Sequence, residues 1–471
     1  MTADVAAIAA RLARGDMAAV VHGATGVTCD DVFHDHREVR PGGLFCCVVG
    51  RRFDGHDHAH DAVAAGAAAL LTQRRLDLGV PEIVVDDVRA AMGPVAALVH
   101  GDPSTDLCCV GITGTNGKTT TAALIAGVLR AAGHDPEVIG TLTGVRTTPE
   151  ATDLQRHLAR ARDAGRTHVV MEVSSHALAE HRVDGMHYAL SVFTNLSRDH
   201  LDFHGTMEEY FRAKARLFEP ELSSRAVVDV DDAHGRLLRD AAAIPVEGFG
   251  DADAEPVEEL APIVLTWAGR TVRLALAGRF NVSNAVAAAS AARALGIDDD
   301  TIAAGLAATE PVPGRFEMVR SGQPFAVIVD FAHTPDGLDK AVAAAREIAG
   351  DRRVLVVFGA GGDRDRTKRP LMGAAVADAD RVVITTDNAR SEAPEQIAAE
   401  ILAGIEDRER VTVSLDRRGA IDTALAEAAP GDVVLIAGKG HETTQTIGAT
   451  SVPFDDRQVA RELLAERGSV P

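Results

Sequence analysis

A glycine-rich segment that ends in lysine and threonine has the residue types of a phosphate-binding loop. It is Thr113-Gly-Thr-Asn-Gly-Lys118-Thr119, and it follows an apolar strand-like run and precedes a helix-like run. Backbone N–H groups of such a loop, together with a helix N-terminus, can hold phosphate oxygens. Lys118 would reach the β- and γ-phosphates, and Thr119 would offer its hydroxyl to Mg²⁺. The strict motif requires glycine at position 112, where this chain has Ile112, so a purely structural glycine turn is the alternative.

Polar side chains follow two other apolar runs. Glu172 ends the run THVVME, and His200 lies in NLSRDH after the run LSVFTN. In open α/β sheets, ligands bind outside the carboxyl ends of the strands. A carboxylate beside a phosphate-binding loop is a natural Mg²⁺ ligand, because this hard cation prefers oxygen donors. His200 considered alone is more often an ordinary loop histidine than a metal ligand.

Lysine is rare in this chain, and its positions are informative. Only five of the 48 basic residues Lys and Arg are lysines, so an ordinary surface cation here is arginine. Lys118, Lys214, Lys368 and Lys439 lie in segments that could form ligand sites, whereas Lys340 has the pattern of a helix surface. A lysine amine can shift its pKa or be modified, whereas arginine stays a charged planar fork. GC-rich coding bias explains the scarcity of lysine but not these positions.

The elements that must position these residues alternate along the chain. Residues 1–102 are expected to form a small α/β domain, with a His/Asp/Gly-rich loop over Asp54 to Asp61. Residues 103–310 repeat strand, glycine or acidic turn, and helix, which predicts a parallel doubly wound sheet with a small antiparallel insertion over 264–278. Residues 311–471 repeat the alternation and predict a Rossmann-like domain. The fold class is therefore α/β with three domains.

Composition limits the function classes. A chain of 471 residues is too long for one core. The net charge of −21 argues against nucleic acid and acidic membrane surfaces as partners. The five cysteines include two adjacent pairs and no C-x-x-C, which indicates buried thiols in a reducing cytosol. No apolar run reaches about 18 residues, so we expect a soluble cytoplasmic protein. We also expect a monomer.

Eleven segments, spread over most of the chain and in a fixed order, carry a family resemblance. They are TGTNGKTTT, TTPEA, MEVSSHAL, HRVDG, FTNLSRDHLDFHGTMEEYFRAKARLF, GRFNVSNA, PGRFEMV, DFAHTPDGL, FGAGGDRDRTKRPLM, DNARSE and AGKGHE. With them the chain resembles the Mur ligases, most closely the MurE type that adds the third residue of the peptide of bacterial cell-wall precursors. The resemblance implies that ATP phosphorylates a substrate carboxylate, and that the amine of an amino acid then attacks the acyl phosphate. The implied substrates are UDP-MurNAc-L-Ala-D-Glu, meso-diaminopimelate and ATP.

The resemblance also assigns nucleotide and metal contacts. It implies two Mg²⁺ ions held by Thr119, Glu172, His200 and Lys214, with Lys214 carbamylated by CO₂ to N6-carboxylysine; Lys118, Glu172, His200 and Lys214 would be catalytic. Only a neutral amine reacts with CO₂, so a desolvated lysine is needed and arginine cannot replace it. Without the resemblance, Lys214 would be a helix-face lysine paired with Glu208 or Glu209. The implied ATP contacts are Gly114, Thr115, Asn116, Gly117, Lys118, Thr119, Thr120, Asn281, Asn284, Arg315, Asp330 and His333.

For the UDP-muramoyl peptide, the resemblance places residues 1–102 at the uridine, as a UDP-binding domain. Two departures from the family pattern fall near substrates: His36 replaces a serine in the D-S-R turn, and Phe331 replaces the tyrosine of D-Y-A-H. The implied contacts to this substrate are Asp35, Arg37, Thr147, Thr148, Ser174 and Arg182.

The segment DNAR at 387–390 resembles the D-N-P-R motif that accompanies meso-diaminopimelate. The distal end of that amino acid carries a carboxylate and an ammonium, so an arginine fork plus an acid would recognise it. Ala389 replaces the proline of the motif and relaxes φ at the turn that aims Arg390. The alternatives are L-lysine or another diamino acid, with Arg390 as ordinary surface charge. The implied amino-acid contacts are Arg364, Asp387, Asn388, Arg390, Gly438 and Glu442.

Two other functions compete with this hypothesis. A folylpolyglutamate synthetase would share the phosphate-binding loop but should lack the combination of SSHAL, FTNLSRDHLDFHG and GKGHE. A non-ligating homologue that acts as a scaffold or regulator should have lost a metal or carbamate position. Glu172, His200 and Lys214 are all present, which favours an enzyme.

Overall fold

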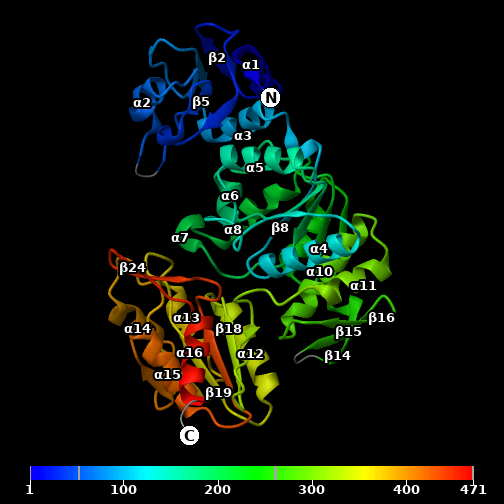
Figure 1. The fold of residues 1–471 in the computed structure, drawn as a ribbon, viewed down its shortest axis with the longest axis vertical. Coiled ribbons are helices and arrows are strands. Elements are labelled where there is room, and N and C mark those ends of the chain that lie inside the picture. The colour runs from blue at the N-terminus through cyan, green and yellow to red at the C-terminus, as the bar shows by residue number, and fades with distance from the viewer. Residues whose placement is uncertain (1, 51–52, 259–261, 469–471) are drawn as a thin grey trace.

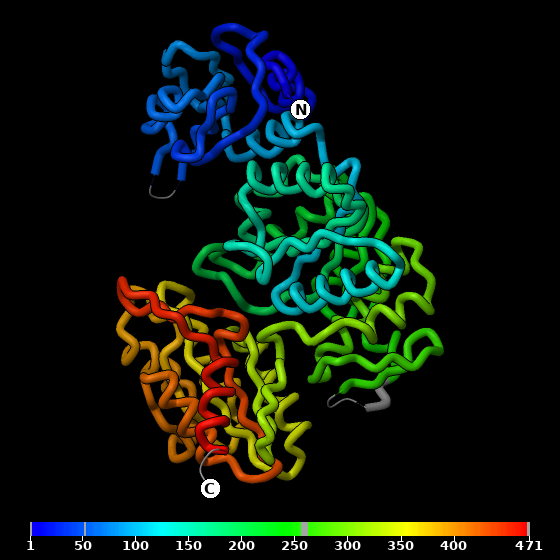
Figure 2. Tube along the Cα trace, in the orientation of Figure 1, coloured from blue at the N-terminus to red at the C-terminus, as the bar shows by residue number. Residues whose placement is uncertain are grey.

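The computed structural model describes residues 2–50, 53–258 and 262–468 and contains three main sheets, one after another along the chain. Figure 1 shows the N-terminal unit at the top, the central unit at the right and the C-terminal unit at the bottom, and Figure 2 shows the chain passing through them in that order. No helix in the described part of the chain is both long enough and apolar enough to cross a membrane.

The N-terminal unit is a five-stranded sheet with order β2-β7-β6-β5-β4. Strand β2 runs antiparallel to β7 and the other pairs are parallel. Its elements are β1 Ala3–Asp4, α1 Val5–Arg14, β2 Ala19–His22, β3 Thr28–Cys29, β4 Asp31–Phe33, β5 Gly43–Cys46, α2 Ala59–Ala64, β6 Ala69–Thr72, β7 Glu82–Val85 and α3 Val88–Val99.

The central unit has six parallel strands in the order β13-β12-β11-β8-β10-β9. The expected antiparallel insertion is confirmed as β14-β15-β16. The elements are β8 Cys108–Thr113, α4 Lys118–Ala131, β9 Glu137–Ile139, α5 Ala151–Asp163, β10 His168–Glu172, α6 Ser175–Ala179, β11 Leu190–Phe193, α7 Leu201–His204, α8 Met207–Ala215, β12 Ala226–Asp229, α9 Ala233–Ala241, β13 Val246–Phe249, β14 Ala254–Glu258, β15 Ile263–Trp267, β16 Arg270–Leu274, α10 Phe280–Ala294 and α11 Asp299–Ala308.

The C-terminal unit has the order β17-β18-β22-β19-β20-β21, with only β17 antiparallel. A hairpin, β23-β24, lies on the side of this unit that faces the central unit (Figure 1). The elements are β17 Glu317–Met318, β18 Ala326–Asp330, α12 Pro335–Ala349, β19 Val354–Phe358, α13 Lys368–Ala374, β20 Arg381–Ile384, α14 Pro394–Leu402, β21 Val411–Val413, α15 Arg417–Glu427, β22 Val433–Ala437, β23 Thr444–Ile447, β24 Thr450–Pro453 and α16 Asp456–Gly468.

The α/β class with parallel sheets is confirmed, and small aliphatic residues build the cores as expected. On one face of the central sheet, Val110 and Ile112 of β8 pack in a cluster with Leu124 of α4 and the alanines of α10. Buried parallel strands carry continuous apolar runs because helices cover both faces.

Two local expectations were wrong. Asp54 to Asp61 is not a loop: a 3₁₀ helix spans Gly55–His58 and α2 begins at Ala59, because Asp54 caps the first turn by accepting a hydrogen bond from the backbone N–H of His56 at 2.9 Å. Cys108 is only partly buried, because it is the first residue of β8, whereas the other four cysteines are buried.

A buried ion pair supports the C-terminal unit, and we expect it to matter for stability. Arg417 and Asp456 are fully buried and joined by two contacts of 2.7 Å. Arg417→Leu should lower the free energy of unfolding by about 3–5 kcal/mol, because it leaves Asp456 buried without its partner. Arg418→Ala is the matched control on the same helix: its ion pairs are exposed, and its loss should cost less than about 1 kcal/mol. Urea unfolding of both variants measures the free energy of unfolding. An equal decrease in the two variants would contradict the prediction.

Candidate active site

A cleft of about 720 Å³ lies where the carboxyl ends of the central strands face the C-terminal unit. Both units contribute polar side chains to its walls. The expected site residues that line it are Thr115, Asn116, Gly117, Lys118, Thr119, Thr120, Thr147, Glu172, Ser174, His200, Asn284, Arg315, Asp330, His333, Arg364, Asp387, Asn388, Arg390, Gly438 and Glu442. The structure therefore brings the nucleotide, metal and amino-acid candidates into one cleft.

The phosphate-binding loop requires glycine for steric reasons. A Cβ on Gly114 would lie 1.9 Å from Oγ1 of Thr194, and a Cβ on Gly117 would lie 2.3 Å from Oδ1 of Asn284. Gly117 also has φ of +88°, a conformation that side chains with a Cβ rarely adopt. Neighbouring side chains thus pack directly against the loop backbone.

Two lysines converge on one carbonyl oxygen of this loop. Lys118 Nζ and Lys214 Nζ each donate a hydrogen bond of 2.8 Å to the carbonyl oxygen of Gly114. Lys118 also donates to the carbonyl oxygen of Thr115 at 2.9 Å. Since the loop carries no carboxylate at this point, the two amines share a neutral acceptor rather than a counter-ion.

Lys214 is buried far more deeply than an ordinary helix-face lysine. Its side chain is 1% exposed, and its Nζ lies 4.8 Å from the centre of the Tyr210 ring. Burial lowers the pKa of Lys214 well below its usual value, and the nearby charge of Lys118 lowers it further. The alternative of a pair with Glu208 or Glu209 is wrong, because both acids bind Arg212 on the exposed face of α8.

Glu172 is oriented by three hydrogen bonds. Its Oε2 accepts from the hydroxyl groups of Thr119 at 3.0 Å and Thr141 at 3.2 Å, and its Oε1 accepts from the backbone N–H of Thr141 at 2.8 Å. The carboxylate is 2% exposed. Arg315 of the C-terminal unit donates to the Thr119 hydroxyl at 2.9 Å, so one hydroxyl group links a carboxylate of the central unit to a guanidinium of the other unit.

Phe331 holds Arg315 in place despite the missing tyrosine hydroxyl. The guanidinium carbon of Arg315 lies 4.4 Å from the centre of the Phe331 ring, within the range of a cation–π interaction. Asp330 accepts backbone hydrogen bonds from Phe316 at 2.7 Å and Ala332 at 2.9 Å. The aromatic face is therefore retained at position 331.

Asp199 is a site residue that the sequence prediction missed. Its carboxylate lies 3.2 Å from Nε2 of His200, 3.7 Å from Nε2 of His333 and 3.4 Å from Nζ of Lys368. Burial opposes its charge, but the histidines and Lys368 hold the pKa of Asp199 well below its usual value. Burial also lowers the pKa of His200 to about 3, so this imidazole is neutral at physiological pH. In the sequence, the position of Asp199 directly before His200 was the available signal.

The amino-acid candidates form a second network at the ends of β20 and β22. Asn388 donates to Oε2 of Glu442 at 2.7 Å, and the same oxygen accepts from Lys439 Nζ at 3.1 Å. Lys439 is fully buried. Arg390 has φ of +51° and donates to the carbonyl oxygen of Gly362 at 2.7 Å. The acid and the arginine of the expected pocket are thus both held at this edge.

Several expected residues lie outside the cleft lining. Gly114, Lys214 and Asn281 are behind it, and Asn281 accepts a hydrogen bond of 2.8 Å from Asn284. Thr148 is 1% exposed and donates to the carbonyl oxygen of Glu172 at 2.9 Å. The side chains of Lys214, Asn281 and Thr148 can position the cleft wall.

The remaining substrate candidates lie further away. Arg182 pairs with Glu150 and Glu180 beside the cleft. Asp35 and Arg37 belong to the N-terminal unit, where they bind each other and the Arg37 side chain is 77% exposed. A substrate that met both regions would have to extend from the N-terminal unit to the cleft.

Comparison with known proteins decides the family. Residues 112–292 match the Mur ligase middle domain, 314–440 the Mur ligase glutamate ligase domain and 31–99 the catalytic domain of the Mur ligase family. The UDP-N-acetylmuramoyl-L-alanyl-D-glutamate–2,6-diaminopimelate ligase of Streptomyces coelicolor is 47% identical over 93% of this chain and 92% of its own length. The chain belongs to the Mur ligase family. Ligases of this family use ATP.

Solved structures of Mur ligases share this fold. A UDP-N-acetylmuramoyl-L-alanyl-D-glutamate–2,6-diaminopimelate ligase superposes with a TM-score of 0.68 and 32% identity, with both chains covered completely. MurF ligase from Thermotoga maritima in complex with ADP gives a TM-score of 0.63 at 20% identity over 93% of this chain and 96% of its own. The second likeness concerns the fold alone.

The depressed pKa of Lys214 has a testable effect on stability. Between its lowered folded-state pKa and the usual value of 10.5, Lys214 is neutral when folded and protonated when unfolded. The unfolded state then binds more protons, so the stability contributed by this residue increases as pH rises. In CO₂-free buffer, Lys214→Met should therefore melt at a higher temperature than the unsubstituted protein at pH 7, and the difference should shrink as pH approaches 10.5.

Lys340→Met is the control, because Lys340 is exposed and paired with Asp336. It should change the melting temperature little at any pH. A Lys214→Met protein that is destabilised equally at pH 7 and pH 10 would contradict the argument.

Proposed function

We propose that this protein is an ATP-dependent ligase that joins meso-diaminopimelate to UDP-MurNAc-L-Ala-D-Glu in the synthesis of peptidoglycan precursors. The observation that carries the proposal is the single cleft that contains both the phosphate-binding loop and the Arg390–Glu442 region. The full-length similarity to ligases named for this reaction supports it. We also propose that the chain has three domains, over residues 1–102, 103–310 and 311–471, and that the protein is a cytoplasmic monomer.

The proposed reaction has two steps. A carboxylate oxygen of the D-glutamyl residue attacks the γ-phosphorus of ATP, and ADP leaves. The amine of the amino acid then attacks the acyl carbon and loses a proton, and inorganic phosphate leaves. Lys118 can neutralise charge on the phosphates from the loop, and Arg315 can do so from the opposite wall, where it already contacts Thr119.

The donor set of the cleft fits two Mg²⁺ ions. Thr119 and Glu172 offer adjacent oxygen atoms, which this hard cation prefers. His200 is neutral, as a metal ligand must be. When bound, the ions would offset the negative charge of a phosphate approached by a carboxylate. Glu172 keeps its orientation through Thr141, and His200 keeps its own through Asp199.

We infer that Lys214 is carbamylated by CO₂. The depressed pKa favours the neutral amine that this reaction requires. The product would be N6-carboxylysine, which carries a negative charge and could ligate the second ion. The carbamate would no longer share the carbonyl oxygen of Gly114 with Lys118 as a second amine. It would instead place a negative charge beside the positive charge of Lys118.

Arg390 and Glu442 would select meso-diaminopimelate. Arg390 can pair with the distal carboxylate, and Glu442 can accept from the distal ammonium. Asp387 packs against Gly438, where a Cβ would lie 2.6 Å from Oδ2 of Asp387. The pocket floor at Gly438 therefore has no room for a side chain. Asn388 and Lys439 hold Glu442 from behind, which gives a structural role to one of the rare lysines.

Amino-acid choice can be tested directly by product mass. The protein is incubated with ATP, UDP-MurNAc-L-Ala-D-Glu and meso-diaminopimelate, L-lysine or L-ornithine. We expect the meso-diaminopimelate product, and Arg390→Met should lower kcat/KM for that amino acid about 100-fold, mainly through KM, because the distal carboxylate loses its charged partner. Arg366→Met, an exposed arginine paired with Glu400, is the control. Equal use of L-lysine, or phosphate release without either substrate, would contradict the proposal.

The carbamate can be tested by chemical rescue. Lys214→Ala should lower ligase activity about 100- to 1000-fold, because a charge that stabilises the transition state is lost. Short carboxylates such as formate or acetate should restore part of it, since the vacated space can hold an anion. Lys214→Arg should not be rescued, because the guanidinium fills the space. Arg212→Ala, on the exposed face of the same helix, should retain full activity, and a Lys214→Arg variant as active as the unsubstituted enzyme would exclude the carbamate.

A further inference from the structure

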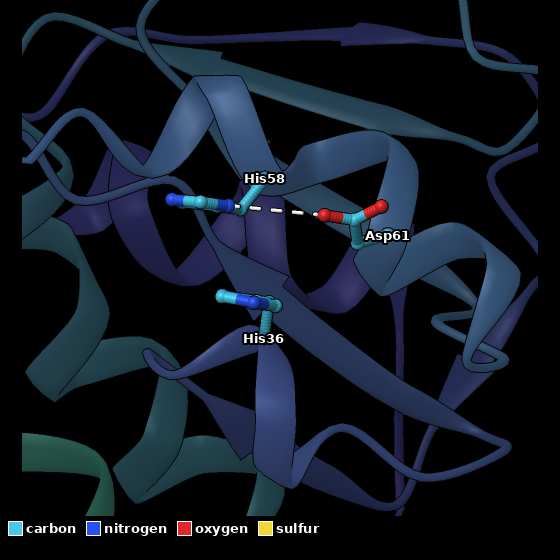
Figure 3. Close-up of side chains that lie close together, drawn as sticks. All are labelled: His36, His58 and Asp61. Carbon is cyan, nitrogen blue, oxygen red and sulfur yellow. Dashed lines mark ion pairs between the residues drawn. The ribbon is translucent and has the colours of Figure 1, made fainter.

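Two histidines and an aspartate lie together in the N-terminal unit, away from the cleft. Nitrogen atoms of His36 and His58 and a carboxylate oxygen of Asp61 all lie within 4.8 Å of one another (Figure 3). The two imidazole rings stack with centres 4.2 Å apart and planes 6° apart. The side chains are partly exposed, with 28% for His36, 39% for His58 and 64% for Asp61. An ion in solution could therefore reach them.

The parallel sheet explains why these residues meet. Strands β4 and β5 are parallel neighbours, so the segments that follow their carboxyl ends meet at one edge. His36 begins the 3₁₀ turn after β4, and His58 ends the 3₁₀ turn Gly55–His58 that follows β5. Asp61 lies three residues after His58, on the first turn of α2. The arrangement is therefore built by the fold and not by one flexible loop.

The ring nitrogens of this pair are available to a ligand. Within residues 2–50, 53–258 and 262–468, neither ring makes a hydrogen bond to the protein: the Nδ1 atoms lie 3.9 Å from Asp35 and 3.8 Å from Asp61, respectively. His56 of the same segment differs, because its Nδ1 contacts Asp54 at 2.5 Å and its Nε2 accepts from the backbone N–H of Gln73 at 3.0 Å. His56 is thus used by the fold, whereas His36 and His58 are not.

We propose that His36, His58 and Asp61 bind a late first-row divalent cation, with Zn²⁺ as the best match. Imidazole nitrogens suit Zn²⁺, Ni²⁺ and Cu²⁺, whereas Mg²⁺ and Ca²⁺ favour sites in which most ligands are oxygen atoms. Three protein ligands leave one tetrahedral position for water or another small ligand. Bonds of about 2.0–2.1 Å require ligand atoms about 3.3 Å apart, so the ion would turn the two rings out of their stacked arrangement until a nitrogen lone pair of each points at it.

Asp35 supplies a carboxylate behind the site, 3.9 Å from His36 Nδ1. This distance is too long for a hydrogen bond, so Asp35 contributes negative charge near the site, which favours a bound cation. The site does not depend on the proposed ligase reaction, and ion binding is a readout independent of that reaction.

The test is a Zn²⁺ titration of the untagged, metal-free, full-length protein by calorimetry, with Mg²⁺ in excess to occupy oxygen-rich sites. We expect one tight Zn²⁺ per chain, and His36→Ala and His58→Ala should each weaken it at least about tenfold, since even outer-shell partners are worth about 10–100-fold. Asp61→Asn should weaken it as well. His60→Ala removes an exposed histidine of the same helix that lies outside the trio, and it should bind Zn²⁺ with unchanged affinity.

Co²⁺ gives a second, spectroscopic readout. It should develop the visible absorption of a tetrahedral nitrogen–oxygen site in the unsubstituted protein and in His60→Ala, but not in His58→Ala. Zn²⁺ bound by histidines of the cleft would remain bound in all variants. This outcome distinguishes it from Zn²⁺ bound by His36, His58 and Asp61. The inference is overturned if the unsubstituted protein binds no Zn²⁺ in excess Mg²⁺, if His36→Ala and His58→Ala retain full affinity, or if His60→Ala weakens binding equally.

Discussion

The shared carbonyl oxygen of Gly114 is the contact on which the rest of the cleft depends. Lys118 and Lys214 both donate to it, and two ammonium groups at one neutral oxygen repel each other in a poorly solvated site. The desolvated position therefore favours a neutral Lys214, while Lys118 faces the cleft. The loop can hold both amines because Gly114 and Gly117 allow Thr194 and Asn284 to pack directly against its backbone.

Contacts between the central and C-terminal units complete the cleft. Without the C-terminal unit, Thr119, Asp199 and Asn116 would each lose a hydrogen-bond or ion-pair partner. In this structure the two units are already joined across the site, so the relative position of the units controls the orientation of catalytic side chains. The contacts are Arg315 to Thr119 at 2.9 Å, Asn116 to Asp336 at 2.9 Å, Arg198 to Thr367 at 2.7 Å and Lys368 to Asp199 at 3.4 Å.

The rare lysines now have distinct environments. Lys118 lies on the phosphate-binding loop and Lys214 is buried beneath it, while Lys340 is a surface residue as expected. Lys368 and Lys439 are both buried beside acids, Asp199 and Glu442 respectively. A compact ammonium fits these confined positions, whereas the larger guanidinium fork would need more space and more acceptors.

The sequence alone determined the features that short segments encode. The loop around Lys118, the alternation of strands and helices and the carboxylate Glu172 depend on local residue order, so they could be predicted together with the α/β class. Tertiary structure decided the rest, because pKa values and ion pairs depend on burial and on residues distant in the chain. Only the fold places Lys214 against a carbonyl 100 residues away, Lys368 against Asp199 across 169 residues, and His36 over His58.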